Sequence, residues 1–207
     1  LIVMGVKASV SKVFELLNQK FLIKRVGNLN DEWSIARFLG RRLKRIGDSI
    51  KFYMDLNFLE DDFEYYDLKR SRPVNTPGSS SIKRIIDGDE ALDQKAHKRF
   101  RSTVGRLQWI CPILPHINFA VKELARSLAG PTVECLAKLK HLLKFLKGTM
   151  SWVFEIRPRD VVDKLKIEVN AYCDSDWAGC SKTRKSTTGF IIFLLGCAIH
   201  FGSKTQA

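Results

Sequence analysis

An alternating run that ends in a carboxylate constrains this chain more than any other stretch. Residues 166–170 alternate polar and apolar side chains, which is typical of a strand with one buried face. The run leads into Asp174, and Asp176 follows soon after. The next apolar run, 191–196, has the composition of a strand and is too short to span a membrane. The pattern predicts a β-hairpin or meander whose first, central strand carries Asp174 at its end.

Two interpretations of Asp174 stay open from the residues alone. An Asp beside Ser, Ala and Gly often does no more than cap a turn. A carboxylate inside a strand pattern, in contrast, needs a partner or a metal ion to offset its desolvation. The position of Asp174 inside the pattern weakens the first interpretation without removing it.

The charge of the chain favours an anionic partner. The 207 residues carry a formal net charge of +13, for which nucleic acid is the default partner and a merely basic surface the alternative. A hydrophobic content of 45% is enough for a real core in one large or two small domains. The five cysteines have no paired metal-ligand spacing, which indicates reduced core residues of an intracellular protein.

Five motifs give the chain a family resemblance. The string DSDWAGCSKTRKSTTGF at 174–190 resembles the start of the ribonuclease H domain in the Pol polyprotein of copia-type LTR retrotransposons. Upstream, in family order, stand FLG at 38–40, RPVNTP at 72–77, INFAV at 117–121 followed by Pro131-Thr132, and FLKGT at 145–149. One such motif is weak, but five in order across nearly the whole chain make the resemblance specific.

The resemblance implies an α+β fold made of consecutive parts. The expected parts are the end of the reverse transcriptase palm with a helical thumb (1–70), a linker (71–88), a helical connection (89–150) and the first antiparallel strands of a truncated ribonuclease H-like domain (151–207). Helical spacing and end signals predict three connection helices, from about 89 to 110, 116 to 130 and 131 to 148. Strands at 152–156 and 166–174 are expected to open the ribonuclease H sheet, and Trp109, Phe119 and Phe145 to lie at core positions of the helices.

The resemblance also implies the chemistry of the parent protein. A ribonuclease H cleaves the RNA strand of an RNA–DNA hybrid with two Mg²⁺ ions held by carboxylates. Asp174 matches the family's first acid and is the predicted catalytic and metal-binding residue, whereas Asp176 is expected outside the direct metal contacts. The other acids are expected beyond Ala207, and the family's Tyr-Val-Asp-Asp motif before Leu1. The chain is therefore expected to be a fragment that catalyses neither DNA synthesis nor RNA cleavage.

Four basic residues and one serine are the predicted nucleic-acid contacts. They are Arg184, Lys185 and Ser186 after Asp174, with Lys144 and Lys147 on the third helix. For the two helix lysines, a solvated helix face is an equal alternative. The implied partners are an RNA–DNA hybrid or duplex nucleic acid and the rest of the Pol polyprotein, with no membrane. The parent element is expected in a cytoplasmic virus-like particle and the nucleus. A stand-alone basic module that binds nucleic acid without catalysis is the alternative function.

Overall fold

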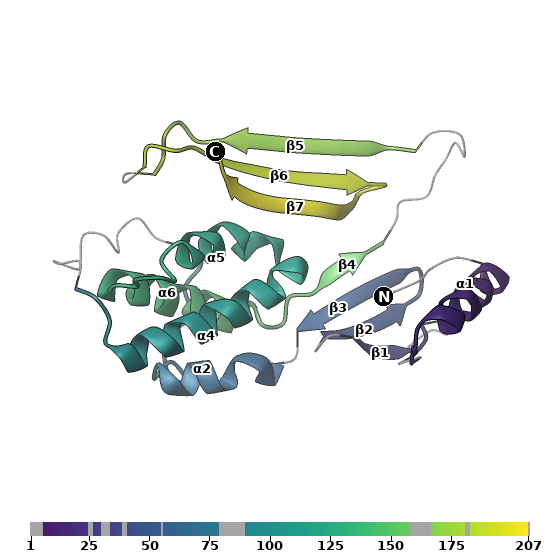
Figure 1. Ribbon diagram of the computed structural model, residues 1–207, viewed down its shortest axis with the longest axis horizontal. Helices are drawn as coiled ribbons and strands as arrows, with labels where there is room; N and C mark the ends of the chain where they lie inside the picture. Colours follow the sequence, from purple (N-terminus) through teal and green to yellow (C-terminus); the bar gives the residue numbers. More distant parts are fainter. Residues whose placement is uncertain are drawn as a thin grey trace.

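The fold contains two antiparallel sheets and a helical part that adjoins both of them (Figure 1). The computed structural model describes residues 6–24, 27–29, 34–38, 41–54, 56–78, 90–157, 167–180 and 183–206. The combination of helices with antiparallel sheets confirms the expected α+β class. The finer division into palm, thumb, connection and ribonuclease H parts stays a prediction.

The first sheet has the strand order β1-β2-β3-β4. Its strands are β1 (Ile35–Phe38), β2 (Arg41–Ile46), β3 (Ser49–Met54) and β4 (Phe154–Ile156). Gly47 takes a positive φ of 54° in the tight β2–β3 turn, a conformation that glycine adopts at little cost. Leu43 of β2 is buried on the face that also carries Phe52 and Phe154.

The pairing of β4 corrects one expectation. Residues 152–156 were expected in one sheet with 166–174, but β4 pairs with β3, and Ile156 lies opposite Ile50. The reason is apolar packing, because the rings of Phe154 and Phe52 meet edge to face with centroids 6.0 Å apart. Phe154 also lies 6.0 Å, centroid to centroid, from Phe201 of the second sheet, so this strand links the two sheets.

The helical part holds the main hydrophobic core. Its elements are η1 (Leu56–Leu59), α2 (Glu60–Tyr65), α4 (Gln94–Ile110), η2 (Cys111–Ile113), η3 (Pro115–Ile117), α5 (Asn118–Ala125) and α6 (Val133–Thr149), and α1 (Lys7–Lys20) precedes the first sheet. Side chains at helical spacing on α4 and α6, among them Phe100, Val104, Leu107, Leu139, Leu142 and Leu143, are fully buried. The Asp93 carboxylate caps α4 by accepting from the Ala96 N–H at 2.8 Å. The three expected helices are confirmed, the first and second in a shorter form.

A buried ion cluster, not expected from the sequence, joins α2 to α4. Asp62 is 0% exposed, and its Oδ1 accepts hydrogen bonds from Arg106 Nη2 at 2.6 Å and Thr103 Oγ1 at 2.7 Å. Arg99 Nη2 lies 3.1 Å from the same oxygen. Tyr66 is within 3.4 Å of Thr103 Oγ1 and donates to it, since the Thr103 hydroxyl proton is used on Asp62. This Asp62 cluster compensates the buried charge through Oδ1, while Oδ2 is buried and has no hydrogen-bond partner among the described residues.

The second sheet consists of β5 (Val169–Ser175), β6 (Thr187–Leu194) and β7 (Cys197–Thr205), in that order. The expected meander is confirmed, but β6 is the central strand and β5 lies at the edge, so the expectation that β5 is central is wrong. No described residue pairs with the outer edge of β5. Six of its seven residues are consequently exposed, and the expected buried face is absent from this strand.

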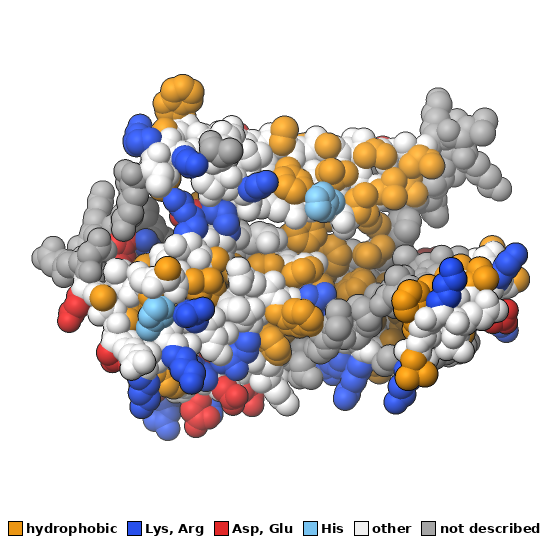
Figure 2. Space-filling view, viewed as in Figure 1, with side chains coloured by type: hydrophobic (Ala, Val, Ile, Leu, Met, Phe, Trp, Pro, Cys, Tyr) orange, Lys and Arg blue, Asp and Glu red, His pale blue; other side chains and the backbone are white. Residues whose placement is uncertain are grey.

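Several side chains that were expected in the core are exposed to solvent. Phe145 is buried, but Trp109 is 45% and Phe119 is 56% exposed, so two of the three aromatic residues expected in the core are at the surface. Cys173 is exposed as well, unlike the buried Cys111. Figure 2 shows hydrophobic side chains gathered over the β5–β7 sheet and Lys and Arg side chains scattered over the helices. Among the described helices, none combines the length and apolar character needed to cross a bilayer.

Candidate functional site

Asp174 lies near the end of the edge strand β5, directly opposite Gly189 of β6. Its side chain is exposed, and its Oδ1 accepts a hydrogen bond only from the neighbouring Ser175 N–H, at 2.8 Å, among the described contacts. A Cβ built on Gly189 would meet no atom within 4 Å, so the space beside the carboxylate is open. Asp174 is therefore not buried and needs no partner to offset desolvation. Its carboxylate is accessible to solvent.

Asp176, in contrast, takes part in several local hydrogen bonds. Its Oδ1 accepts hydrogen bonds from the N–H groups of Thr187 at 2.7 Å and Gly179 at 3.4 Å, and its own N–H donates to the Thr187 carbonyl at 3.1 Å. A Cβ at Gly179 would lie 2.4 Å from Asp176 Oδ2, so a larger residue there would have to displace the Asp176 carboxylate. Asp176 thus closes the base of the β5–β6 connection in the manner of an Asx turn.

The described parts of the β5–β6 connection, residues 176–180 and 183–186, present two cations to solvent. The Ser186 hydroxyl accepts from the Ala178 N–H at 3.0 Å, and the Arg184 N–H donates to the Cys180 carbonyl at 2.8 Å. Ser186 is therefore part of the connection's internal bonding, whereas the side chains of Arg184 and Lys185 are exposed. Of the three residues predicted here as phosphate contacts, Arg184 and Lys185 have side chains exposed to solvent.

Helix α5 anchors this connection to the helical part. Lys122 Nζ donates to Thr187 Oγ1 at 2.8 Å, and Arg126 Nη2 donates to Cys180 Sγ at 2.8 Å. The hydrogen bond to Cys180 raises the pKa of the Arg126 guanidinium above its usual value. Sequence reasoning missed both anchors. Lys122 and Arg126 are four residues apart, at the end of α5 and directly after it, so their side chains lie on the same side of the helix. No local pattern indicates that their partners are Thr187 and Cys180.

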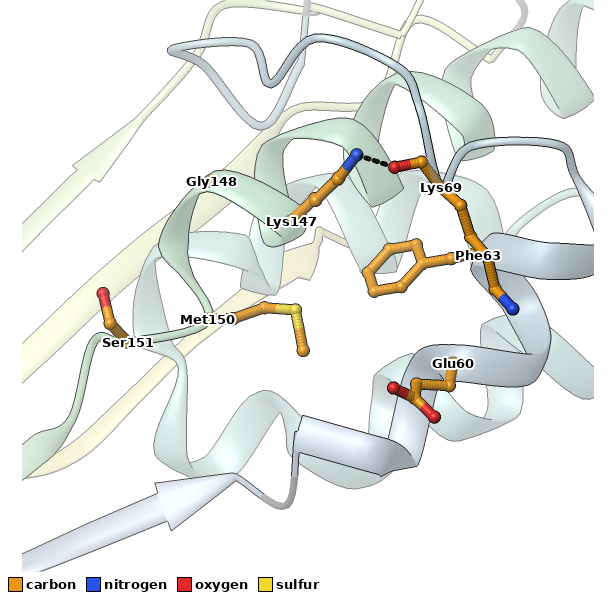
Figure 3. A pocket seen from close by; sticks show the side chains of 7 residues that line it. All are labelled: Glu60, Phe63, Lys69, Lys147, Gly148, Met150 and Ser151. Atoms are coloured by element: carbon orange, nitrogen blue, oxygen red, sulfur yellow. Dashed lines mark hydrogen bonds between the residues drawn. The ribbon is translucent and has the colours of Figure 1, made fainter.

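Lys147 belongs to a second group of contacts. Its Nζ donates to the carbonyls of Leu68 at 3.1 Å and Ser71 at 2.9 Å, and also to that of Lys69. Figure 3 shows Lys147 reaching Lys69 at the rim of a hollow of about 560 Å³. The lining residues are Glu60, Phe63, Lys69, Lys147, Gly148, Met150 and Ser151. With its three N–H donors directed to carbonyls, Lys147 holds the segment after α2, apart from the β5–β6 connection.

A Lys147→Met variant is therefore expected to lose stability and to keep its nucleic-acid affinity. Removing the ammonium group leaves three carbonyls without this donor. The unfolding free energy is expected to fall by about 1 kcal/mol, and the loss stays this small because water can hydrogen-bond to part of the site. Urea unfolding and hybrid binding measure the two properties. Lys144→Met is the matched control on the same helix, because Lys144 has no hydrogen bond or ion pair within the described residues. A loss of affinity without a loss of stability would contradict this role.

The described residues do not form a magnesium site by themselves. Asp174 contributes a single carboxylate, and across the described ranges no three His, Cys, Asp or Glu side chains are grouped so that they could hold a metal ion. Mg²⁺ held by one carboxylate keeps most of its waters and dissociates readily. Any magnesium chemistry at Asp174 therefore requires ligands from other residues.

Comparison with known proteins adds relatives that span most of the chain. The chain is 31% identical over 187 residues to the uncharacterized mitochondrial protein AtMg00810 of Arabidopsis thaliana, covering 90% of the chain and 74% of that protein. It is 29% identical to the retrovirus-related Pol polyprotein from transposon RE1 of Arabidopsis thaliana over 92% of the chain. It is 28% identical to the corresponding polyprotein from transposon TNT 1-94 of Nicotiana tabacum over 97% of the chain. The chain spans only 12% and 15% of these two polyproteins. No family model and no solved structure matches it.

Proposed function

The chain belongs to the family of retrovirus-related Pol polyproteins from copia-type transposons, and we propose that it is the part of a reverse transcriptase–ribonuclease H that carries the first acid for hybrid cleavage. One observation supports this most directly. Asp174 is an accessible carboxylate near the end of β5, and the exposed cations Arg184 and Lys185 lie on the connection that follows this strand, where Asp176 accepts a hydrogen bond from the Thr187 N–H. In this proposal, the parent polyprotein performs RNA-templated DNA synthesis and cleaves the RNA of RNA–DNA hybrids.

Asp174 supplies one of several carboxylates in this proposal. Carboxylate oxygens are the ligands that Mg²⁺ prefers, and a pair of such ions stabilises charge during phosphodiester cleavage. Since the described residues bring no three potential ligands together, we propose that cleavage needs carboxylates from elsewhere in the polyprotein. The 207-residue chain alone then binds nucleic acid without cleaving it.

Arg184 and Lys185 of the β5–β6 connection bind the nucleic-acid backbone in this proposal. A net charge of +13 attracts a polyanion from a distance, and the exposed side chains of Arg184 and Lys185 offer donors to phosphate oxygens. Phosphate contacts carry no sequence information, so the binding is expected to depend on backbone charge rather than base sequence.

A non-catalytic basic module is the second candidate. It is favoured by the absence, among the described residues, of any group of three His, Cys, Asp or Glu side chains that could hold a metal ion. Such a module would bind the same nucleic acids, but Asp174 would have no role in any reaction. The two candidates therefore differ in the consequence of an Asp174 substitution inside a longer Pol protein.

Titration of the chain with a labelled RNA–DNA hybrid at increasing salt tests the binding. We expect the logarithm of the association constant to fall steeply with the logarithm of salt concentration. An Arg184→Gln/Lys185→Gln variant is expected to make this slope shallower by about 2, close to one per lost phosphate contact. Lys95→Gln/Lys98→Gln on the exposed surface of α4 is the control, because it removes the same charge elsewhere. Binding that is absent in low salt, or indifferent to salt, would overturn the proposed function.

A further inference from the structure

Strand β5 leaves one edge of the second sheet unpaired. Its partner is β6, and within the described ranges no residue pairs with its other side. The Glu168 carbonyl accepts from the Leu195 N–H, and the Asp176 N–H likewise bonds toward β6. Backbone groups alternate in direction along an antiparallel strand, so the even-numbered residues face β6 and the odd-numbered residues face outward. The outward-facing residues of β5 are Val169, Ala171, Cys173 and Ser175.

This outward edge offers backbone groups to a further strand. Of its N–H groups, that of Ser175 donates to Asp174 Oδ1 at 2.8 Å, and the others have no hydrogen-bond partner in the described part of the chain. Edge strands are usually protected by lysine, proline, a bulge or a covering element. β5 contains no lysine or proline and pairs with β6 without a bulge, whereas β7 carries Lys204 and an irregularity beside Ile192. Figure 1 shows β7 nearest the helical part and β5 on the far side of the sheet from it.

We propose that β5 pairs with β5 of a second copy of this chain, antiparallel about a two-fold axis at Tyr172. Backbone groups of two strands bond only where outward-facing residues lie opposite each other. An axis at Tyr172 meets this condition over the whole strand, because Val169 lies opposite Ser175 of the second copy. Ala171 lies opposite Cys173 in the same register. The two three-stranded sheets then form one continuous sheet, and this self-association is independent of the proposed function.

The side chains in this register are complementary. Asn170 lies opposite Asp174 of the second copy, and an amide group donates to a carboxylate. The Asn170 amide gives one of its two hydrogens to Glu168 Oε1 at 2.5 Å, which leaves the second for Asp174. Tyr172 lies opposite Tyr172 of the second copy in a non-hydrogen-bonded pair, where opposed side chains are closest. Its ring meets Phe193 and is still 63% exposed, so pairing buries apolar surface that one copy leaves in water.

The neighbouring two-fold registers fit less well. An axis at Ala171 places Glu168 opposite Asp174 of the second copy, and like charges directly opposite each other destabilise a strand pair. An axis at Cys173 leaves Val169 without a partner inside β5. Each of these registers pairs a shorter part of the strand than the axis at Tyr172 does. The match of β5 to its own sequence therefore favours a second copy as the occupant.

Substitutions at the axis test this register, because residue 172 meets itself there. In sedimentation equilibrium without nucleic acid, we expect the unaltered chain to dimerise as its concentration rises. About 0.15 M salt screens much of the repulsion that the net charge of +13 causes between copies. Tyr172→Lys and Tyr172→Glu are each expected to raise the dimer dissociation constant on the order of tenfold, since each opposes like charges and removes an aromatic pair. An equal mixture of the two variants is expected to dimerise again, because the ammonium group then faces the carboxylate.

A proline substitution tests the role of the backbone separately. Ala171→Pro removes an outward N–H that β6 does not use, and proline is tolerated at such edge positions. We expect this variant to keep its far-UV circular dichroism spectrum and to weaken dimerisation at least on the order of tenfold. Ala171→Val keeps the N–H group and is the matched control, expected to dimerise like the unaltered chain.

The outcomes that would overturn the proposal are distinct. An unaltered chain that stays monomeric up to its solubility limit would refute self-association. Dimers that form equally well in the Tyr172 variants and in Ala171→Pro would place the interface elsewhere. If Tyr172→Lys and Tyr172→Glu are each weakened but their mixture is not restored, the two-fold register at Tyr172 is wrong. Hybrid binding by a chain that stays monomeric would leave the proposed function standing and refute only this inference.

Discussion

An Asp62→Ala variant is expected to lose roughly 3–5 kcal/mol of unfolding free energy, because it removes the centre of a buried ion cluster. Asp62 is fully buried and binds Arg99, Arg106 and Thr103 through one oxygen. Both arginine side chains are 25% exposed and can turn partly to water, which favours the lower end of this range. Urea unfolding followed by far-UV circular dichroism measures the loss, which is a large share of the stability of an ordinary domain.

Asp61→Ala is the matched control for this prediction. The Asp61 side chain is exposed, and its contact with Arg99 uses the backbone carbonyl at 2.8 Å, which the substitution keeps. Its unfolding free energy is expected to change by no more than about 0.5 kcal/mol. Equal losses of unfolding free energy in the two variants would contradict this prediction. They would show that the stabilisation comes from the acidic first turn of α2 as a whole and not from the Asp62 cluster.

The sequence was sufficient for the elements whose signals are local. Helical spacing of apolar residues and end signals located α4 and α6, and alternation with glycine-containing turns located the β5–β7 meander. In each case a residue's neighbours in the sequence decide its conformation. The Asp62 cluster is harder to predict, because Arg99, Thr103 and Arg106 form only a polar stripe on α4, and their acid lies in a different helix.

The sheet positions of β4 and β5 were predicted wrongly because they depend on pairing between strands that can be distant in the sequence. β4 has only three residues, and its partner β3 is distant in the sequence, so the contact between Phe52 and Phe154 decides its sheet. The place of β5 at the edge of its sheet likewise depends on which strands pair, and alternation cannot show this. The exposure of Asp174 follows from that edge position.

The candidate site was predictable in part. The motif singled out Asp174 and the cations Arg184 and Lys185, and the structure places all three side chains in solvent on one strand end and its connection. The distinct role of Asp176 depends on the position of the Thr187 N–H, which only the folded connection provides. Lys147 was grouped with the phosphate contacts because a carbonyl-binding lysine and a solvent-exposed one look alike in a sequence.

In a longer Pol protein that supplies the remaining carboxylates, Asp174→Asn is expected to abolish cleavage of an RNA–DNA hybrid. Asparagine keeps the shape of the side chain but loses the negative charge that divalent cations need. Hybrid binding is expected to change little, since phosphate contacts with basic side chains supply the affinity. Asp176→Asn is expected to cleave nearly normally, because its amide oxygen can still accept from the N–H of Thr187.

Mg²⁺-dependent cleavage of a labelled RNA–DNA hybrid by this longer protein tests the role of Asp174 most directly. The unaltered longer protein, its Asp174→Asn and Asp176→Asn variants and the 207-residue chain are compared side by side for cleavage and for binding. The account predicts that all four bind the hybrid and that only the unaltered longer protein and Asp176→Asn cleave it. Cleavage by Asp174→Asn but not by Asp176→Asn, or cleavage by the 207-residue chain alone, would contradict it.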